Sequence, residues 1–594
     1  MIQIKNILSI LSLEEKNQLF FLFFINLLVA ILDMVGVASI MPFISLLSDQ
    51  KLIFENVLYN KLYTYFNFTD PRQFVFAFGL VVFSLIVLSI SMKALTTYLQ
   101  IRFALMREYT IGKRLIKGYL NHSYVWFLNK NSGDLGKSIL SELQTVIVGS
   151  ILPMLIIVSQ GFVVFALLCL LFFIDIKLAL ILGVVIMISY IIINKVMNGP
   201  ISNIGIDRVK ANKDRYIAVN EAFGGIKEVK VNGLENYYTE NFSKPSKIYA
   251  SNQATAQLIA QMPKFLIEGI AFGLLLVVLL YYIYLGESLT NILPVVSMYA
   301  FAAYRLLPAL QQVYGSFSQI KFSSPSLNSI LFDLNEFYHS DKIINFTKSI
   351  DFNNEITLKD VSFHYPNTYK PTLVNINLTI LANSTIGFVG STGSGKTTIL
   401  DIILGLLDPQ EGQLLVDGEV INNANRRNWQ NTIGFVPQQI YLSDDTIASN
   451  IAFGVNKEDI NLNAVEIAAK ISNLHDFVIK NLNEGYDTII GERGVRLSGG
   501  QRQRIGLARA LYYNPKILIL DEATSALDNI TEYAVMEAIS NLNKEITVIM
   551  VAHRLTTVMN CDIIFCIENG TIKAKGTYNE LKDKVDIFKS MLNT

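Results

Sequence analysis

Six apolar runs of membrane length constrain the fold of this chain more than any other feature. A helix needs about 20 apolar residues to cross a bilayer. Of the 594 residues, 51% are hydrophobic and only 16% are charged, which is unusual for a soluble protein. The runs lie at Leu19–Leu47, Phe74–Met92, Val146–Ile174, Leu178–Met197, Phe265–Leu285 and Ile292–Phe317. We therefore expect an α-helical membrane domain with six transmembrane helices over residues 1–325.

The lysines and arginines between these runs predict how the chain is oriented. They gather in two long polar segments, residues 93–145 and 198–264. Because cytoplasmic loops carry an excess of Lys and Arg, both segments and both chain ends are expected in the cytoplasm. The first apolar run is too long for a cleaved signal and has no small-residue cleavage site behind it. It is therefore expected to remain as the first transmembrane helix.

A short amphipathic helix is expected on the outer side, between the first two apolar runs. Its apolar side chains share one helical face and comprise Val57, Leu58, Leu62, Tyr65 and Phe66. Such a helix can lie at the lipid interface. It can equally pack against a neighbouring span, and the sequence does not decide between these two alternatives.

A change of composition over residues 326–350 predicts a linker to a second domain at 351–594. In that domain, short β-rich runs alternate with helical patterns, which indicates an α/β fold. The expected strands are Ile356–Phe363, Thr385–Val389, Gln413–Val416, Thr432–Val436, Ile517–Leu520, Thr547–Val551 and Ile563–Glu568.

A glycine-rich phosphate loop follows the apolar strand Ile386–Val389 and opens a helix at Thr398–Leu407. The backbone N–H groups of such a loop point at phosphate oxygens. Lys396 supplies a charge to the β- and γ-phosphates of ATP, and Thr397 offers a hydroxyl to Mg²⁺. The predicted ATP-binding residues here are Gly390, Ser391, Thr392, Gly393, Ser394, Gly395, Lys396, Thr397 and Thr398.

Two carboxylates end a second apolar strand, Ile517–Leu520. Asp521 is expected to hold Mg²⁺, usually through water, and Glu522 lies where a base can polarise the attacking water. Taken alone, an apolar strand that ends in Asp-Glu is a weak signal. Together with the phosphate loop upstream, it predicts ATP hydrolysis.

The segment Leu497–Gln501 lies between these two motifs and precedes a helical run. Ser498, Gly499, Gly500 and Gln501 would place a second anion site at a helix N-terminus. One domain binds one γ-phosphate, which Lys396 already contacts. The second anion site is therefore expected to cap the ATP of a partner domain.

In this order, the motifs resemble those of ATP-binding cassette (ABC) exporter half-transporters, and the resemblance covers nearly the whole chain. It implies a homodimer with two competent ATP sites, because the chain has one cassette. It also implies that Tyr365 stacks on adenine, that Gln438 senses Mg²⁺ and contacts the membrane domain, and that His553 contacts the γ-phosphate. Asp528 would lie between the two ATP sites. The turns near Tyr124–Asn131 and Glu221–Gly225 would dock on the cassettes.

Asp33, Glu268 and Arg305 are ionisable residues within the apolar runs. Ionisable side chains are costly inside a membrane and are functional candidates by default. An arginine there suits a phosphate or pyrophosphate group, which makes these residues substrate candidates. Alternatively, Arg305 pairs with Asp33 or Glu268 as a structural bridge. Both alternatives are open at the level of sequence.

The membrane half is similar to PglK-type flippases, which turn over undecaprenyl-pyrophosphate-linked oligosaccharides for protein glycosylation. The similarity is carried by Met41–Ile44, Ile267–Gly269 and Tyr304–Pro308. It implies that the chain flips a lipid-linked oligosaccharide from the cytoplasmic to the outer leaflet of a bacterial inner membrane. The alternative is an exporter of another amphiphile, such as a lipid A-like lipid, a peptide or a drug.

Other classes of function fit the sequence less well. A degenerate regulator or an ATP-gated channel is disfavoured, because the hydrolytic residues Glu522 and His553 are present. The net charge is zero, so bulk electrostatics give no reason to expect nucleic acid as a partner. A soluble cassette ATPase is excluded by the six apolar runs.

Overall fold

The computed structural model describes residues 2–584, except 175, 266–267, 270–271, 274–275, 277–279, 281–288, 341–349, 367, 369, 492–493, 524–528, 543–544 and 553–554. The chain divides into two compact units, each with its own hydrophobic core. The membrane unit comprises Met1–His122 and Asn129–Asp341. The cassette unit comprises Ser123–Leu128 and Lys342–Thr594.

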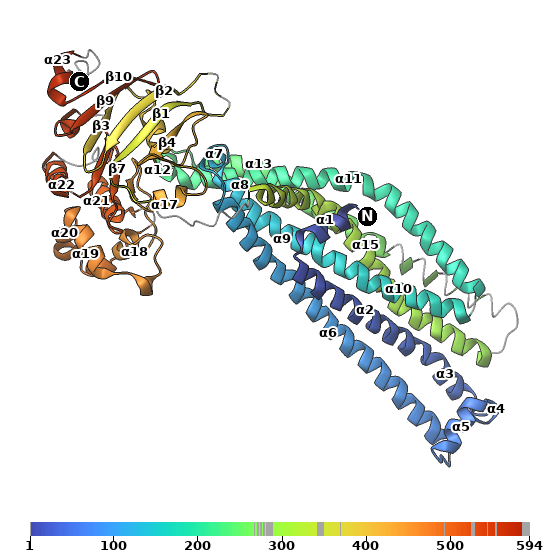
Figure 1. The fold of residues 1–594 in the computed structure, drawn as a ribbon. Helices are drawn as coiled ribbons and strands as arrows, with labels where there is room; N and C mark the ends of the chain where they lie inside the picture. The colour runs from blue at the N-terminus through green and yellow to red at the C-terminus, as the bar shows by residue number, and fades with distance from the viewer. Residues whose placement is uncertain are drawn as a thin grey trace. The chain divides into compact units, whose positions relative to one another are not determined.

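The membrane unit is built from long helices that pack side by side (Figure 1). Its first half contains α1 (Ile2–Ile10), α2 (Leu13–Ala38), α3 (Ile40–Ser48), α4 (Leu52–Glu55), α5 (Val57–Tyr65) and α6 (Pro71–Leu120). Its second half contains α8 (Ser132–Lys137), α9 (Leu143–Val146), α10 (Leu152–Ile174), α11 (Ile176–Gly224), α12 (Ile226–Val231), α13 (Glu235–Gln261) and α15 (Leu289–Ser340). Helix α10 packs against α2, α11 and α15, while α2 also packs against α6.

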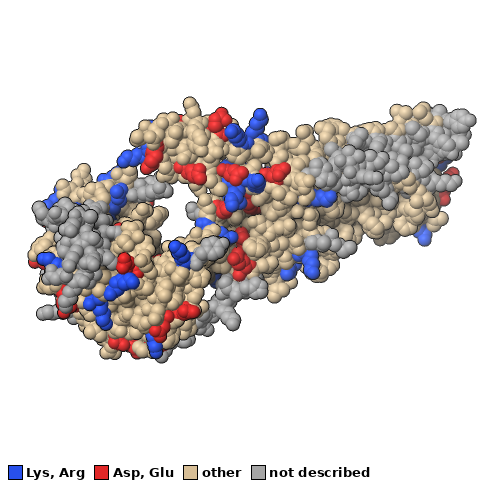
Figure 2. All heavy atoms as spheres, turned by 90° about the horizontal axis from the view of Figure 1, so that it is seen from above, with Lys and Arg blue, Asp and Glu red and all other residues tan. Residues whose placement is uncertain are grey.

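Three helical stretches among the described residues are long and apolar enough to cross a membrane: Leu13–Ser48, Pro71–Leu120 and Gly133–Ile174. They contain the first three predicted spans. The fourth and sixth predicted spans lie in α11 and α15, and much of the fifth lies outside the described residues. On the face in Figure 2, the described helices of this unit carry few charged side chains along much of their length.

Polar contacts fix α2 against α6 at three levels. At the start of α2, Ser12 and Glu15 form a capping box, which satisfies two of the free N–H groups of the first turn. Glu15 also binds Arg107 of α6, with Oε1 2.6 Å from Nη1. Further along, Gln100 donates a hydrogen bond to Asn26 at 2.7 Å, and Ser89 donates one to Asp33. The apolar face alone would allow these helices to slide, whereas the paired polar groups fix their register.

Two π-helical segments interrupt the helix that leads into α10. They span Ser138–Glu142 and Ile147–Ile151. A π turn accommodates an extra residue and therefore changes which side chains face a neighbouring helix. Glu142 ends the first segment and forms an ion pair with Arg208 of α11, with Oε2 2.7 Å from Nη2 and both side chains 1% exposed. In the second segment, Ser150 lies 2.6 Å from the hydroxyl of Ser323 in α15.

The segment between α3 and α6 packs through a residue that the sequence analysis did not select. Tyr63 of α5 is buried and forms a cluster with Leu46, Ile53, Phe74 and Val75. The five residues of the predicted apolar face are instead exposed, from 44% at Leu62 to 78% at Tyr65. Helix α5 therefore packs on its neighbours with one face and presents a separate apolar face outward.

The cassette unit contains two sheets flanked by helices. The first sheet has the order β2-β1-β4-β5, and the second has the order β10-β9-β3-β8-β7-β6. Their strands are β1 (Glu355–Phe363), β2 (Leu373–Leu381), β3 (Thr385–Val389), β4 (Glu411–Val416), β5 (Glu419–Val420), β6 (Ile433–Val436), β7 (Ile517–Asp521), β8 (Thr547–Val551), β9 (Ile563–Glu568) and β10 (Thr571–Gly576). All seven predicted strands are present, and β2, β5 and β10 are additional.

The second sheet is parallel from β9 to β6, and β10 pairs antiparallel at its edge. The helices of this unit are α16 (Lys396–Ile403), α17 (Arg426–Gln430), α18 (Ile447–Ile451), α19 (Leu462–Ile471), α20 (His475–Asn481), α21 (Gly499–Leu511), α22 (Asn529–Leu542) and α23 (Tyr578–Lys584). The predicted fold class, a helical membrane domain joined to an α/β cassette, is confirmed.

One helix of the cassette unit comes from far upstream in the sequence. Helix α7 (Tyr124–Leu128) clusters with the cassette rather than with the helices that precede and follow it. Val125 packs against the cassette core, at the apolar cluster that contains Ile399, Leu400 and Ile403 of α16. The turn predicted near Tyr124–Asn131 thus places its first five residues in the cassette unit.

We expect Arg208→Met to destabilise the membrane unit by about 3–5 kcal/mol, because the charge of Glu142 would stay buried without its partner. A fall in the melting temperature of the detergent-solubilised protein measures this. The exposed pair of Lys230 and Glu235, whose charged atoms lie 3.0 Å apart, offers a matched control. Lys230→Met should leave the melting temperature unchanged. If Arg208→Met melts at the wild-type temperature, the buried pair does not stabilise the helices.

Candidate functional site

The phosphate loop lies at the carboxyl end of β3, a strand that is buried along its whole length. Gly395 precedes the first residue of α16 and has a φ of +107°, a conformation that L side chains rarely adopt. A Cβ at Gly395 would also lie 2.7 Å from Cδ2 of Leu373. Glycine is therefore required for the loop to turn into the helix, as the sequence pattern predicts.

Lys396 lies inside this loop with only 5% of its surface exposed. Its Nζ donates hydrogen bonds to the carbonyl oxygens of Gly390 at 2.8 Å and Ser391 at 2.9 Å. Burial lowers the pKa of Lys396, and the nearby charges of Glu522 and Asp521 oppose this effect. The loop thus holds a buried cation close to the acidic pair.

The loop also contains a hydroxyl that fits a phosphate ligand. Ser394 is 3% exposed, and its Oγ has no hydrogen-bond partner within the described part of the chain. A buried polar atom without a partner is costly, and a phosphate oxygen would satisfy it. Thr397, in contrast, is exposed, so its hydroxyl is accessible to a metal ion bound with the nucleotide.

Gln438 and Glu522 meet across neighbouring parallel strands. Gln438 follows β6, and Glu522 follows β7, which pairs with β6. Gln438 donates a hydrogen bond from Nε2 to Oε2 of Glu522 at 2.6 Å. Glu522 has a φ of +51°, a rare conformation for a non-glycine residue, and its N–H donates to the carbonyl oxygen of Val551 at 3.2 Å. Local strain at this residue is typical of a functional site.

Tyr365 lies next to the first turn of α16. Its hydroxyl is 3.2 Å from Oγ1 of Thr398, and its ring packs edge-on against Phe363 with centroids 5.1 Å apart. Burial raises the pKa of the Tyr365 hydroxyl. The structure therefore brings the predicted adenine-stacking residue to the helix that starts at Lys396.

The segment Ser498–Gln501 does not join this group. Ser498 caps α21 and Gln501 completes a capping box, with hydrogen bonds of 2.8 and 3.2 Å. Ser498 is exposed. No hydrogen bond or ion pair within the described residues connects the segment to the phosphate loop. Ser498–Gln501 is thus a candidate anion site separate from the phosphate loop.

Arg509 is a residue of this region that the sequence analysis did not single out. It lies in α21 and donates hydrogen bonds to the carbonyl oxygens of Asn450 and Tyr441, both at 2.8 Å. Its guanidinium stacks over the ring of Phe453 at 4.5 Å. Burial lowers the pKa of Arg509 to about 10. Arg509 thereby ties the helix capped by Ser498 to the segment that follows Gln438. The repeated arginines of α21 were the only sequence signal.

Asp401 in α16 is a second residue that sequence reasoning missed. Burial, helped by the charge of Asp521, raises its pKa to about 6. The same carboxylate contributes to raising the pKa values of Tyr124 and Tyr365, for which burial is the larger cause. Asp401 is therefore a partly buried carboxyl group near the acidic pair. Among the predicted ATP-site residues, Asp528 and His553 lie outside the described residues.

The substrate candidates Asp33, Glu268 and Arg305 form two separate groups. Asp33 is fully buried and lies 3.8 Å from Arg305 of α15, measured from Oδ1 to Nη1. Ser89 donates a hydrogen bond to the same oxygen, while Oδ2 of Asp33 has no hydrogen-bond partner in the part of the chain described here. Glu268 instead lies 3.9 Å from Lys264 and accepts a hydrogen bond from Gln311 at 3.3 Å. Arg305 thus pairs with Asp33, and its side chain remains 20% exposed.

Two family models match this chain. The model described as the ABC transporter transmembrane region matches residues 19–306, and the model described as ABC transporter matches residues 373–525. The chain belongs to the ABC transporter family. The second match contains the phosphate loop, Gln438, the Ser498 segment and the acidic pair. The protein is therefore an ATPase that uses ATP with Mg²⁺ and couples hydrolysis to transport.

Several curated relatives that are similar to this ABC transporter are flippases. The ATP-dependent lipid A-core flippases of Escherichia coli (strain K12) and of Shigella flexneri are each 32% identical to it over 483 residues. The alignment covers 81% of this chain and 81% of each relative. Among solved structures, a bacterial Atm1-family ABC exporter with ATP bound matches 97% of this chain and 98% of its own, with a TM-score of 0.78 and 21% identity. That structure supports the exporter fold.

The raised pKa of Asp401 predicts a pH-dependent effect on stability. Its folded-state pKa of about 6 lies above the ordinary value of 3.8, so stability is lost as the pH rises through this interval. Asp401→Asn should therefore be more stable than the wild type at pH 8. We expect its free energy of unfolding to be higher by about 1–2 kcal/mol, after allowance for solvent screening. The difference should vanish near pH 4. Thermal unfolding of the full-length protein across this range tests it.

The exposed Glu458→Gln variant is the matched control and should follow the wild-type curve at every pH. A gain in stability for Asp401→Asn that is equal at pH 4 and pH 8 would show that ionisation of Asp401 is not the cause.

Proposed function

We propose that this transporter is an ATP-driven flippase for an amphipathic lipid whose head group carries phosphate. In this proposal it acts as a homodimer in a bacterial inner membrane, with both chain ends in the cytoplasm. The hydrogen bond between Gln438 and Glu522, beside the phosphate loop, is the observation that supports ATP hydrolysis at this site. The identity to lipid A-core flippases supports the cargo part.

The residues of the loop bind and orient the nucleotide. When bound, Mg-ATP supplies the γ-phosphoryl group that is transferred to water. Lys396 would leave its two carbonyl partners and place its charge on the β- and γ-phosphates. Thr397, Asp521 and Gln438 are the metal-binding candidates, and Tyr365 would support the adenine ring.

Glu522 is the candidate general base. A base must lie within hydrogen-bond reach of the water that it deprotonates. Glu522 has a rare backbone conformation, and Gln438 donates a hydrogen bond to one of its carboxylate oxygens. In this proposal the Glu522 carboxylate would accept a proton from the attacking water. His553 and Asp528 belong to the same proposal by resemblance to the family.

The dimer follows from the separation of the two anion sites. Ser498 is exposed and begins α21 together with the partly buried Gly499 and Gly500, and no hydrogen bond to the phosphate loop occurs within the described residues. Two chains arranged with twofold symmetry would let each such segment cover the γ-phosphate held by Lys396 of the other. Arg509 would pass this closure to the segment after Gln438, because it bonds to Tyr441.

A lipid A-like glycolipid is the leading cargo, because the relatives at 32% identity carry that activity in their names. The second candidate is a polyprenyl-pyrophosphate-linked oligosaccharide. The short strings Met41–Ile44 and Tyr304–Pro308 favour it, together with the partly exposed guanidinium of Arg305 in α15. Both lipids carry phosphate next to a hydrocarbon tail, so the same arginine could bind either head group.

Glu522→Gln should retain ATP binding and lose hydrolysis by about 10²–10⁴-fold, since glutamine keeps the shape but cannot accept the proton. Phosphate release measures hydrolysis, and a fluorescent ATP analogue measures binding. The exposed Glu458→Gln variant serves as the control and should hydrolyse ATP like the wild type. Near-normal hydrolysis by Glu522→Gln would remove this residue as the base.

Arg305→Gln should reduce flipping by about tenfold or more, because a charged hydrogen bond to phosphate contributes about 1.5–3 kcal/mol. Basal ATP hydrolysis should persist. The assay follows a lipid A-type glycolipid, and separately a short-tailed lipid-pyrophosphate glycan, in proteoliposomes with Mg-ATP. Asp33→Asn separates the two roles of Arg305, since it removes the carboxylate partner and leaves the arginine.

If Arg305 binds phosphate, the double variant with Asp33→Asn stays as defective as Arg305→Gln. If Arg305 only neutralises Asp33, the double variant regains flipping, and the phosphate role is refuted. Transport of the glycolipid alone supports the leading cargo, and transport of the pyrophosphate glycan alone selects the second. Movement of dyes or peptides, with neither lipid moved, would contradict both.

A further inference from the structure

A groove between α3 and the start of α6 belongs to none of the sites described above. Its volume is about 450 Å³, and it is lined mainly by Phe43, Leu47, Val75, Phe76 and Leu80. Both helices lie in stretches that are long and apolar enough to cross a membrane. The lining is therefore hydrocarbon-like on both walls.

The floor of the groove is fixed by packing. Val75 is 8% exposed and belongs to the cluster around Tyr63 and Phe74, against which Phe43 also packs. The absence of a side chain at Gly79 lets α6 approach Phe43, because a Cβ there would lie 2.8 Å from the phenyl ring. The groove is thus a built feature of the helix pair.

The walls remain open to the surroundings. Leu47 is 61% exposed, Phe76 70% and Leu80 51%. From Arg72 to Leu80 the lining extends for eight residues of α6, or about 12 Å at 1.5 Å per residue. One leaflet contributes about half of the roughly 30 Å hydrocarbon core. The groove therefore matches the depth of a single leaflet.

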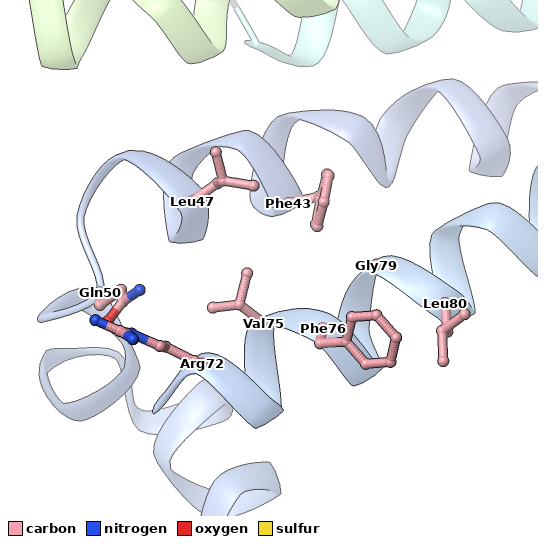
Figure 3. A pocket seen from close by; sticks show the side chains of 8 residues that line it. All are labelled: Phe43, Leu47, Gln50, Arg72, Val75, Phe76, Gly79 and Leu80. Carbon is pink, nitrogen blue, oxygen red and sulfur yellow. The ribbon is translucent and has the colours of Figure 1, made fainter. Parts of the chain in front are cut away.

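Polar groups gather at one end only. Figure 3 shows Arg72 and Gln50 together at that end, while Gly79 and Leu80 lie at the other. The two neighbouring carboxylates are engaged by the backbone: Asp70 accepts the N–H of Arg72, and Asp49 accepts that of Lys51, both at 2.9 Å. No ion pair to the Arg72 guanidinium occurs within the described residues.

We propose that this groove binds a bilayer phospholipid, with one acyl chain along the apolar walls and the phosphate on Arg72 and Gln50. The fork of an arginine matches two phosphate oxygens. Arg72 lies in the first turn of α6, so we expect its guanidinium at the membrane depth of the lipid head groups. In the orientation proposed above, this is the outer leaflet. Phospholipid of the surrounding bilayer is the committed occupant, since it is in contact with the open walls at all times.

The test uses the full-length protein in nanodiscs that contain phosphatidylglycerol with a photoreactive acyl chain. Crosslinked peptides are identified by mass spectrometry. For the wild type, we expect label on the peptides that contain Leu47 and Phe76. Arg72→Gln should reduce this label about tenfold, as expected for loss of a charged hydrogen bond. Leu47→Trp should reduce it by filling the groove.

Matched variants control for nonspecific effects. Arg102→Gln removes another exposed arginine of α6, and Val81→Trp adds a tryptophan at an exposed position outside the groove. Both should label like the wild type. The melting temperature of each variant shows that it is folded, and labelling is compared only among folded variants.

Two results would overturn the proposal. Equal groove labelling in the wild type, Arg72→Gln and Leu47→Trp would show that the groove and its arginine select no lipid. Groove labelling that a lipid A-type glycolipid abolishes, and that unlabelled phosphatidylglycerol does not, would show that the occupant is the transported lipid. Competition by phosphatidylglycerol alone supports the proposal, and this outcome is independent of which cargo the transporter flips.

Discussion

The buried ion pair between Glu142 and Arg208 is the interaction on which the arrangement of the membrane unit depends. Both side chains are 1% exposed, and each has further polar partners: Asn212 donates to Glu142 at 2.8 Å, and Arg208 donates to Ser326. The pair therefore joins α11 and α15 to the helix that leads into α10. Burying two charges costs desolvation energy, so such a pair stabilises the fold only when the ion pair is close and further hydrogen bonds support it. The three helices are thus expected to move together rather than to slide past one another.

The ATP site depends on a different constraint, the parallel pairing of strands. In a parallel sheet, all carboxyl ends reach the same edge, where ligands bind. Lys396 follows β3, Gln438 follows β6, and Glu522 follows β7, so residues separated by up to 126 positions in sequence gather there. The apolar runs of these strands serve two purposes. They form the core of the cassette, and they bring the reactive side chains to one edge.

Local patterns in the sequence were sufficient to predict the phosphate loop, the acidic pair, the position of Ser498 at a helix start, and seven of the ten strands. Contacts between distant residues were not predictable in this way. In the sequence, Arg509 is one arginine among several. Its role depends on hydrogen bonds to two carbonyl groups on other segments, which only the fold brings near. Asp401 has an ordinary helical position, and only burial beside Asp521 raises its pKa. The pairing of Arg305 with Asp33 was one of two open alternatives, because sequence distance says nothing about which helices are neighbours.

The assignment of Ser123–Leu128 to the cassette unit means that the cassette is discontinuous in the gene. Its sequence is one long segment from Lys342 onward plus six residues encoded more than 200 positions earlier. If a cassette were exchanged between related transporters at the 341–342 boundary, its core would therefore pack against the residue that the recipient chain has at the position of Val125. Recombination or engineering in this family is expected to succeed when that short upstream segment travels with the domain it packs on.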